Sequence, residues 1–197
     1  MMEIKGKKLN NSGASILELI IAVAIMVIMI SGITIGFSVV TNSYAKRAAS
    51  TMRDVLETTR TKAMTIAADE WKLDISKSTD GDYIYKIIKT TTVQKDDGST
   101  EVKSEVIEQE VLGGDLSMNF VDVGTDSSNI EITTDKSVSI VFKPGVGSVE
   151  KVYVSGTNIE DITGRTLGEM AKLTISRGSY SKTIELYYTT GKCESVD

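Results

Sequence analysis

The chain of 197 residues contains no histidine, one cysteine and one proline. Without histidine it cannot supply a Ser-His-Asp triad, a histidine-ligated metal centre or an imidazole general base from its own side chains. The single cysteine, Cys193, excludes an internal disulfide and any zinc site that needs several thiolates, while pairing between chains stays open. Because Cys193 lies close to the C-terminus, we expect a thiol on a mobile tail.

The charged and apolar residues are distributed unevenly. The formal net charge of -5 opposes nonspecific binding of nucleic acid by the whole surface, so nucleic acid is not supported as a direct partner. Hydrophobic residues make up 41% of the chain, yet no charged residue occurs between Leu19 and Ala45. The chain therefore divides into an apolar N-terminal part and a polar remainder.

The N-terminal part begins with a short basic segment that contains Lys5, Lys7 and Lys8. A helix over the following apolar run, from Leu19 to Val40, would be about 33 Å long, which matches the core of a bilayer. The positive-inside rule then predicts a cytoplasmic N-terminus and an exported C-terminus. A secretory signal peptide is the alternative, but its apolar part normally runs about 7–15 residues and ends in a small-residue cleavage site. The longer run favours a retained helix.

Glu18 is an ionisable residue at the start of this apolar run. A carboxylate inside a membrane costs a few kcal/mol on insertion scales and by default indicates a function. The alternative is that Glu18 marks the boundary of the helix in the head-group zone.

The segment from Gly13 through Ala14 and Glu18 to Ile21, behind a lysine-containing leader, resembles the class III signal of type IV prepilins and type II secretion pseudopilins. The resemblance joins a basic leader, a glycine at the cut, a glutamate as the fifth residue after it, and a long apolar helix. It implies that a prepilin peptidase cuts after Gly13 and that the new amino group of Ala14 is methylated. Ala14 stands where the family most often has Phe, and the proline common in the middle of the pilin helix is absent.

Cleavage after Gly13 would give Glu18 a positively charged partner. The α-amine of Ala14 in one subunit could meet Glu18 of a neighbour when apolar helices bundle, and a charge pair in low dielectric selects one axial offset. Gly32 and Gly36 have Gly-x-x-x-Gly spacing, which suits either a close-packing face or a locally meltable stretch. Glycine is also simply frequent in membrane helices, and this interpretation is slightly favoured.

The stretch from Thr41 to about Ala68 is compatible with a helix that continues into the head. Apolar and small residues recur there at three- and four-residue steps: Ala48, Met52, Val55, Thr59, Ala63 and Ile66. Charged residues fill the gaps and are expected to form a solvated face: Lys46, Arg47, Arg53, Asp54, Glu57, Arg60 and Lys62.

After Trp71 the sequence changes to short β-rich stretches separated by turn residues. The predicted strands are Trp71–Ile75, Tyr83–Val93, Val102–Val111, Leu116–Val121, Ile130–Thr133, Val138–Phe142, Lys151–Val154, Lys172–Ser176 and Thr183–Tyr188. Antiparallel pairing is expected, with a tight hairpin turn at Asp96-Asp97-Gly98 and a longer loop at Arg177–Ser181. Strands that follow one helix predict an α+β fold, a long N-terminal hydrophobic helix with a β-rich antiparallel head.

The head also resembles that of minor pseudopilin H and FimT-like proteins. The resemblance rests on the helical segment Leu56–Ala63 that leads to Trp71, on Phe142-Lys143-Pro144-Gly145, and on the terminal hairpin that ends at Thr190-Gly191-Lys192. It implies a minor, tip-located subunit rather than the bulk pilin.

Other features of the head give no catalytic or metal site. Asp122 and Asp126 could form a calcium loop, but ordinary turn chemistry is favoured because no EF-hand spacing is present. Gly113-Gly114-Asp115 lacks the Lys-Ser/Thr of a phosphate loop. The tyrosines of the last hairpin, Tyr180, Tyr187 and Tyr188, are expected to pack the sheet rather than to act as an adhesive.

The sequence therefore predicts a non-enzymatic filament subunit, a pilin or minor pseudopilin. Its expected parts are a leader at 1–13, an N-terminal helix at 14–68 with a transmembrane half at about 17–40, and an exported head at 69–197. The resemblance implies other subunits, a prepilin peptidase and an assembly platform with its ATPase as partners, and no cofactor or metal is expected. The expected location is the inner membrane, single-pass with the N-terminus cytoplasmic, and a cell-surface filament after assembly.

Several alternatives stay open. A single-span, membrane-anchored protein that binds a ligand or adheres through its head is the main rival, and an exported hydrolase with a helical anchor is a third possibility. The machine itself could be a pilus, a secretion pseudopilus or a DNA-uptake apparatus.

Overall fold

The structure is a computed structural model that describes residues 16–123, 129–155, 160–161 and 170–196, without the side chains of 30–41 and 160–161. The chain divides into two compact units, Met1–Val40 and Thr41–Asp197. We call them the N-terminal unit and the head, and each is described by itself. The helix α1 (Ile16–Thr65) crosses the boundary between them.

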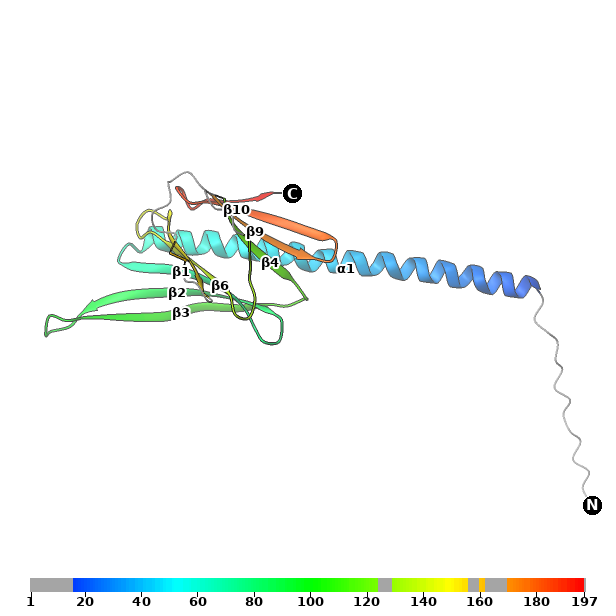
Figure 1. The fold of residues 1–197 in the computed structure, drawn as a ribbon, viewed down its shortest axis with the longest axis horizontal. Helices are drawn as coiled ribbons and strands as arrows, with labels where there is room; N and C mark the ends of the chain where they lie inside the picture. The colour runs from blue at the N-terminus through cyan, green and yellow to red at the C-terminus, as the bar shows by residue number, and fades with distance from the viewer. Residues whose placement is uncertain (1–15, 124–128, 156–159, 162–169, 197) are drawn as a thin grey trace, which may run out of the picture. The chain divides into compact units, whose positions relative to one another are not determined.

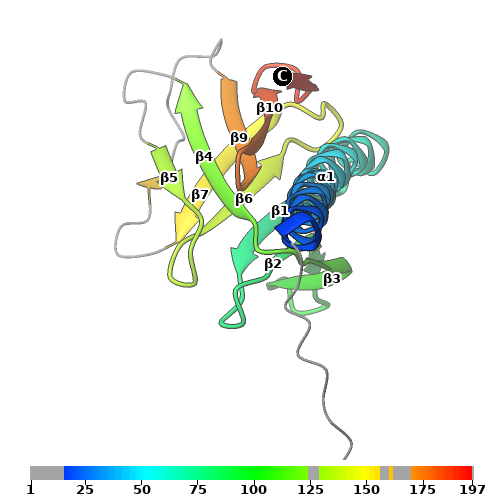
Figure 2. The same cartoon turned by 90° about the vertical axis from the view of Figure 1, so that its right-hand side faces the viewer.

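The head contains two antiparallel sheets (Figures 1 and 2). One has six strands in the order β3-β2-β1-β6-β7-β8, and the other has five in the order β11-β10-β9-β4-β5. The strands are β1 (Asp69–Lys77), β2 (Tyr83–Gln94), β3 (Thr100–Leu112), β4 (Ser117–Val123), β5 (Asn129–Glu131), β6 (Ser137–Phe142), β7 (Val149–Ser155), β8 (Glu160–Asp161), β9 (Met170–Arg177), β10 (Tyr180–Tyr187) and β11 (Cys193–Val196). Nine of them match predicted strands, whereas the short β8 and β11 were not predicted.

Alternating side chains create the buried faces of both sheets. In β1, Trp71, Leu73 and Ile75 are buried while their neighbours are partly exposed, and β9 repeats the pattern with Leu173 and Ile175. This period of two follows from the pleat of a strand, which sends successive side chains to opposite faces. The two inner faces belong to one hydrophobic core.

Two predicted hairpins are present, and one is tighter than expected. β2 and β3 pair along their length and are joined through the turn at Asp96-Asp97-Gly98, where Gly98 has a φ of 83°. β9 and β10 are joined by only Gly178 and Ser179, because Tyr180 already pairs with Arg177. Gly178 has a φ of 60°, which fits a two-residue turn with glycine in its first central position. The longer loop predicted at Arg177–Ser181 is therefore wrong.

Residues 42–65 of α1 belong to the head and pack against its core. Five of the six predicted apolar positions are buried, at Ala48, Met52, Val55, Thr59 and Ala63. The sixth, Ile66, lies beyond the last residue of α1 and is 42% exposed. The Phe-Lys-Pro-Gly element meets this end of the helix, since the Gly145 amide donates a 2.8 Å hydrogen bond to the Ala63 carbonyl. This bond satisfies one of the carbonyls that a helix leaves unpaired at its C-terminus.

The predicted fold class, a long hydrophobic helix followed by a β-rich head, is wrong. Strands make up 51% of the structure, in two antiparallel sheets, and the class is mostly β. The described helical side chains fall into two shorter stretches, 16–29 and 42–65. The first is apolar apart from Glu18, whereas the second alternates core residues with charged ones at helical spacing. Hydrophobic residues of 42–65 therefore contribute to the core of the β fold instead of extending an apolar helix.

The predicted transmembrane half at about 17–40, and with it the single-pass membrane location, is also corrected. Within the described part of the chain, no helix is both long and apolar enough to cross a bilayer.

Candidate functional site

The N-terminal unit presents an apolar helical surface that nothing in the described chain covers. Every side chain of α1 from 16 to 29 is exposed, and its large apolar residues are between 51% and 80% exposed. They are Ile16, Leu17, Leu19, Ile20, Ile21, Val23, Ile25, Met26, Val27, Ile28 and Met29. Exposed apolar surfaces of this kind mark interaction sites, so this stretch is a candidate site for an apolar partner.

Glu18 is the one acidic residue in the first turn of α1, and its side chain is exposed. A carboxylate there interacts favourably with the partial positive charge of a helix N-terminus, so the position also has a local explanation. The predicted cleavage residues Gly13 and Ala14 and the leader lysines Lys5, Lys7 and Lys8 lie outside the described residues. Gly32 and Gly36 fall within α1, but in the stretch 30–41 whose side chains are not described.

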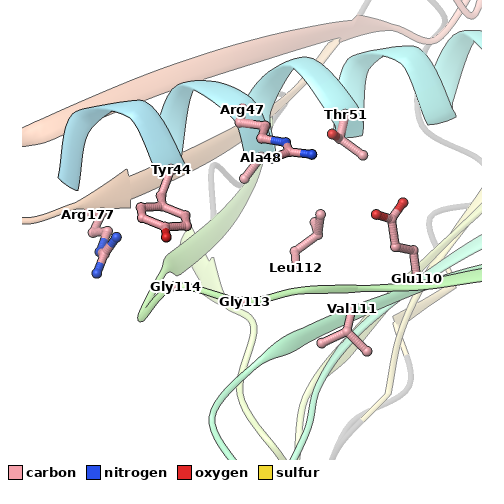
Figure 3. Close-up of a pocket in the computed structure, with 10 residues that line it drawn as sticks. All are labelled: Tyr44, Arg47, Ala48, Thr51, Glu110, Val111, Leu112, Gly113, Gly114 and Arg177. Carbon is pink, nitrogen blue, oxygen red and sulfur yellow. The ribbon is translucent and has the colours of Figure 1, made fainter. Parts of the chain in front are cut away.

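The head has a cavity of about 440 Å³ beside the first turns of its helix (Figure 3). We call it the Arg47 groove, and its walls include Tyr44, Arg47, Thr51, Glu110, Gly114 and Arg177. Arg47 and Thr51 come from α1, Glu110 from β3 and Arg177 from the end of β9. The groove thus combines two guanidinium groups and one carboxylate on elements that are far apart in the sequence.

The Arg177 side chain contacts the Tyr44 ring, and one of its terminal nitrogens has no hydrogen-bonding partner among the described residues. Its guanidinium carbon lies 4.8 Å from the centroid of the Tyr44 ring, a cation–π contact. One terminal nitrogen of Arg177 is buried and makes no hydrogen bond to any described residue. Most buried polar atoms in proteins are hydrogen-bonded, so this nitrogen is a candidate donor to an acceptor outside the described residues.

The loop after β3 allows the groove to form. Gly114 has a φ of 112° and Asp115 a φ of 53°, both in the left-handed region. A side chain at Gly114 would lie 3.3 Å from the Tyr44 ring, so glycine is needed both for the turn and for the close approach of the ring. Glu110 is oriented separately, because the Tyr85 hydroxyl donates a 2.7 Å hydrogen bond to it. Burial and the Glu110 charge together raise the pKa of Tyr85 well above its usual value.

The charged face of the helix is less solvated than predicted. Nε of Arg60 donates a 2.9 Å hydrogen bond to the carbonyl of Thr190, and Glu57 accepts one of 3.1 Å from the amide of Cys193. Glu57 and Arg60 also pair with each other at 3.3 Å. These two residues therefore hold the chain where it enters β11.

Cys193 is buried, so the prediction of a thiol on a mobile tail is wrong. Burial first, and the nearby Glu57 charge second, raise the pKa of the Cys193 thiol to about 12. Tyr188 is also buried, and its hydroxyl donates a 2.9 Å hydrogen bond to the buried Asp122 carboxylate. Asp126 lies outside the described residues.

A scan of protein-family models, a search of curated proteins and a search of solved structures found no match to this chain. The pilin resemblance therefore depends only on the residues in which it was found. Sequence reasoning placed Arg47 on a solvated face and did not find the groove. The only local signal is the helical spacing of Tyr44 and Arg47, since Arg177 is distant in the sequence.

Proposed function

We propose that the chain is a structural subunit of a filament of the type IV pilus kind, a pilin or minor pseudopilin, that polymerises through the N-terminal part of α1. The observation that carries this proposal is the apolar surface over 16–29, exposed on all sides of the helix. Association of such surfaces is favoured by about 25 cal/mol for each Å² of apolar area removed from water. Copies of the same helix supply a partner of matching chemistry.

The proposal includes removal of the leader. A prepilin peptidase would cut after Gly13, and the α-amine of Ala14 would then pair with Glu18 of a neighbouring subunit. Apolar helices alone can slide along one another, whereas a charge pair in low dielectric has to be satisfied at one offset. Cleavage would thus create the group that sets the register of assembly.

The head has a hydrophobic core made from its own residues. Its core combines both sheets with the buried residues of the helix from Ala45 to Ala63. The N-terminal surface can therefore engage other subunits without taking apolar residues from the core of the head. This separation of a packed head from an exposed apolar helix supports a structural role.

The test compares Glu18→Ala with Glu18→Asp in cells that carry the prepilin peptidase and the assembly machinery. Immunoblots of sheared filaments measure how much of each variant is incorporated. We expect a loss of at least tenfold for Glu18→Ala and partial retention for Glu18→Asp, which keeps the charge. Equal incorporation of Glu18→Ala and the unaltered chain would remove Glu18 from the proposal. Absence of the unaltered chain from filaments would instead favour the rival, a ligand-binding or adhesion protein.

A further inference from the structure

We propose that the Arg47 groove of the head is a docking site for the acidic β2–β3 turn of a second copy of this chain, with Asp96 and Asp97 as the docked residues. The inference rests on the proposed filament function and adds a contact between heads to the contact between helices. The groove is incomplete in the isolated chain, and the second copy supplies the missing acceptor.

The chemistry of the groove calls for a carboxylate. Arg177 has a buried terminal nitrogen without an acceptor among the described residues, and the side chain of Arg47 lines the same groove. Neither arginine forms an ion pair with any described residue. A guanidinium prefers a planar oxyanion, with which it forms two parallel hydrogen bonds. A carboxylate delivered by a protein segment meets this requirement.

The β2–β3 turn carries such carboxylates at an accessible position. Residues 92–100 are all exposed, and the hairpin projects from the other strands of the head (Figure 1). Asp97 is held in one orientation, since it accepts a 2.9 Å hydrogen bond from the amide of Ser99. The Ser99 hydroxyl and amide lower the pKa of Asp97, so this carboxyl is ionised at neutral pH. A turn that is already ordered loses less conformational entropy on binding.

The mixed charge of the groove favours this turn over a purely acidic segment. Glu110 lies in the groove with the two arginines, and it would repel a segment that carries only negative charge. The turn has Lys95 directly before Asp96, so it carries a cation beside its carboxylates, and Nζ of Lys95 lies 3.4 Å from Glu101 of the same hairpin. Opposite charges on both partners suit a specific contact, because misaligned copies bring like charges together.

The positions of the turn and the groove determine the symmetry of the contact. The turn precedes the first residue of β3, Thr100, whereas the groove includes Glu110 and Leu112 at the end of the same strand. At about 3.3 Å per residue, these features lie about 40 Å apart. A turn therefore cannot reach the groove of its own chain. Contacts between two different surfaces generate an open chain of subunits unless the rotation closes a ring.

The experiment uses the full chain with Thr51→Cys in the groove, Thr100→Cys beside the turn and Cys193→Ala, so that both arginines and both aspartates stay in place. The chains are treated with a mild oxidant and analysed by non-reducing electrophoresis. We expect a ladder of dimers, trimers and larger species, because each copy offers both a turn and a groove. Thr51→Cys or Thr100→Cys alone, each with Cys193→Ala, can give dimers at most. The matched control has Asp135→Cys, in another exposed acidic turn, in place of Thr100→Cys, and there we expect at least tenfold less ladder.

The outcomes separate this contact from the filament proposal. Cross-linking no stronger than that of the Asp135→Cys control would overturn the docking contact even if the chain is found in filaments. A ladder from chains that never enter filaments would support the contact and count against the filament function. A second test uses Arg47→Glu and Asp96→Lys. In chains that keep Cys193, each change alone should weaken association at least fivefold. A mixture of the two variants should associate as the unaltered chain does. A mixture that associates no better than either variant alone would contradict the pairing.

Discussion

Nε of Arg60 lies 2.9 Å from the carbonyl oxygen of Thr190, so one hydrogen bond joins residues that are 130 positions apart. The bond links α1 to the segment that leads into β11, and the nearby Glu57 holds the amide of Cys193. The short C-terminal strand is therefore fixed to the helix as well as to β10. This relationship makes the last strand part of the folded head.

The first prediction concerns this hydrogen bond. Arg60→Ala should lower the free energy of unfolding by about 1–3 kcal/mol, because it removes a hydrogen bond to a charged group and leaves a carbonyl without its partner. Urea unfolding followed by circular dichroism measures the change. Arg53→Ala is the matched control, since Arg53 forms an exposed ion pair with Asp54, and it should stay within about 0.5 kcal/mol. Equal effects of the two variants would show that the bond to Thr190 contributes nothing.

The second prediction compares two glycines with similar backbone angles. Gly178 and Gly191 have φ values of 60° and 65°, but a side chain at Gly191 would collide with the carbonyl of Gly147, whereas Gly178 has open space around it. Gly178→Ala should cost about 1–2 kcal/mol of strain. Gly191→Ala should cost at least about 2 kcal/mol more, because the loop from Lys143 to Ser148 has to move. Similar midpoints of thermal unfolding for the two variants would contradict the packing described for Gly191.

The third prediction tests the link between the two sheets. The buried Tyr83 hydroxyl of β2 donates a hydrogen bond to the Ile132 carbonyl and accepts one from the Met118 amide of β4, both at 3.0 Å. Tyr83→Phe leaves these backbone groups unpaired and should lower stability by about 1–3 kcal/mol. Tyr180→Phe, at a partly buried tyrosine of β10, should change it by less than about 0.5 kcal/mol. Both values come from urea unfolding, and a loss at Tyr180 as large as that at Tyr83 would argue against the link.

The sequence predicted the strands of the head well because alternation is a local signal, as in Trp71, Leu73 and Ile75. The buried positions of the helix from Ala48 to Ala63 were also predictable from their spacing. The hydrogen bonds of Arg60 to Thr190 and of Glu57 to Cys193 could not be predicted. A charged residue on the polar face of a helix has the same sequence pattern whether its side chain faces solvent or bonds to a distant backbone group. The Arg47 groove could not be predicted for the same reason, because it forms only when β9 and α1 come together in the folded chain.

The fourth prediction concerns acid stability. Asp69 accepts a 2.6 Å hydrogen bond from Thr91 and pairs with Lys89 at 3.0 Å, and these contacts lower the pKa of its carboxyl in the folded state. A lowered folded pKa stabilises the fold above the unfolded value of about 3.9, and this contribution disappears as the pH falls through the folded pKa. Asp69→Asn should therefore destabilise the chain at pH 7 and weaken the loss of stability between about pH 5 and 2. Unfolding curves across that pH range measure the free energy of unfolding, with Asp135→Asn as the exposed control. A pH dependence unchanged in Asp69→Asn would contradict this assignment.

The fifth prediction tests the central claim, that the chain works as a trimmed subunit of a filament. Intact-mass spectrometry of chains recovered from sheared filaments tests this claim most directly. We expect a species that begins at Ala14 and carries one added methyl group. Gly13→Trp should abolish this species and filament incorporation together, while Gly6→Trp, within the leader but away from the cut, should leave both unchanged. Filaments that contain chains with residues 1–13 intact, or that contain no copy of this chain, would contradict the account.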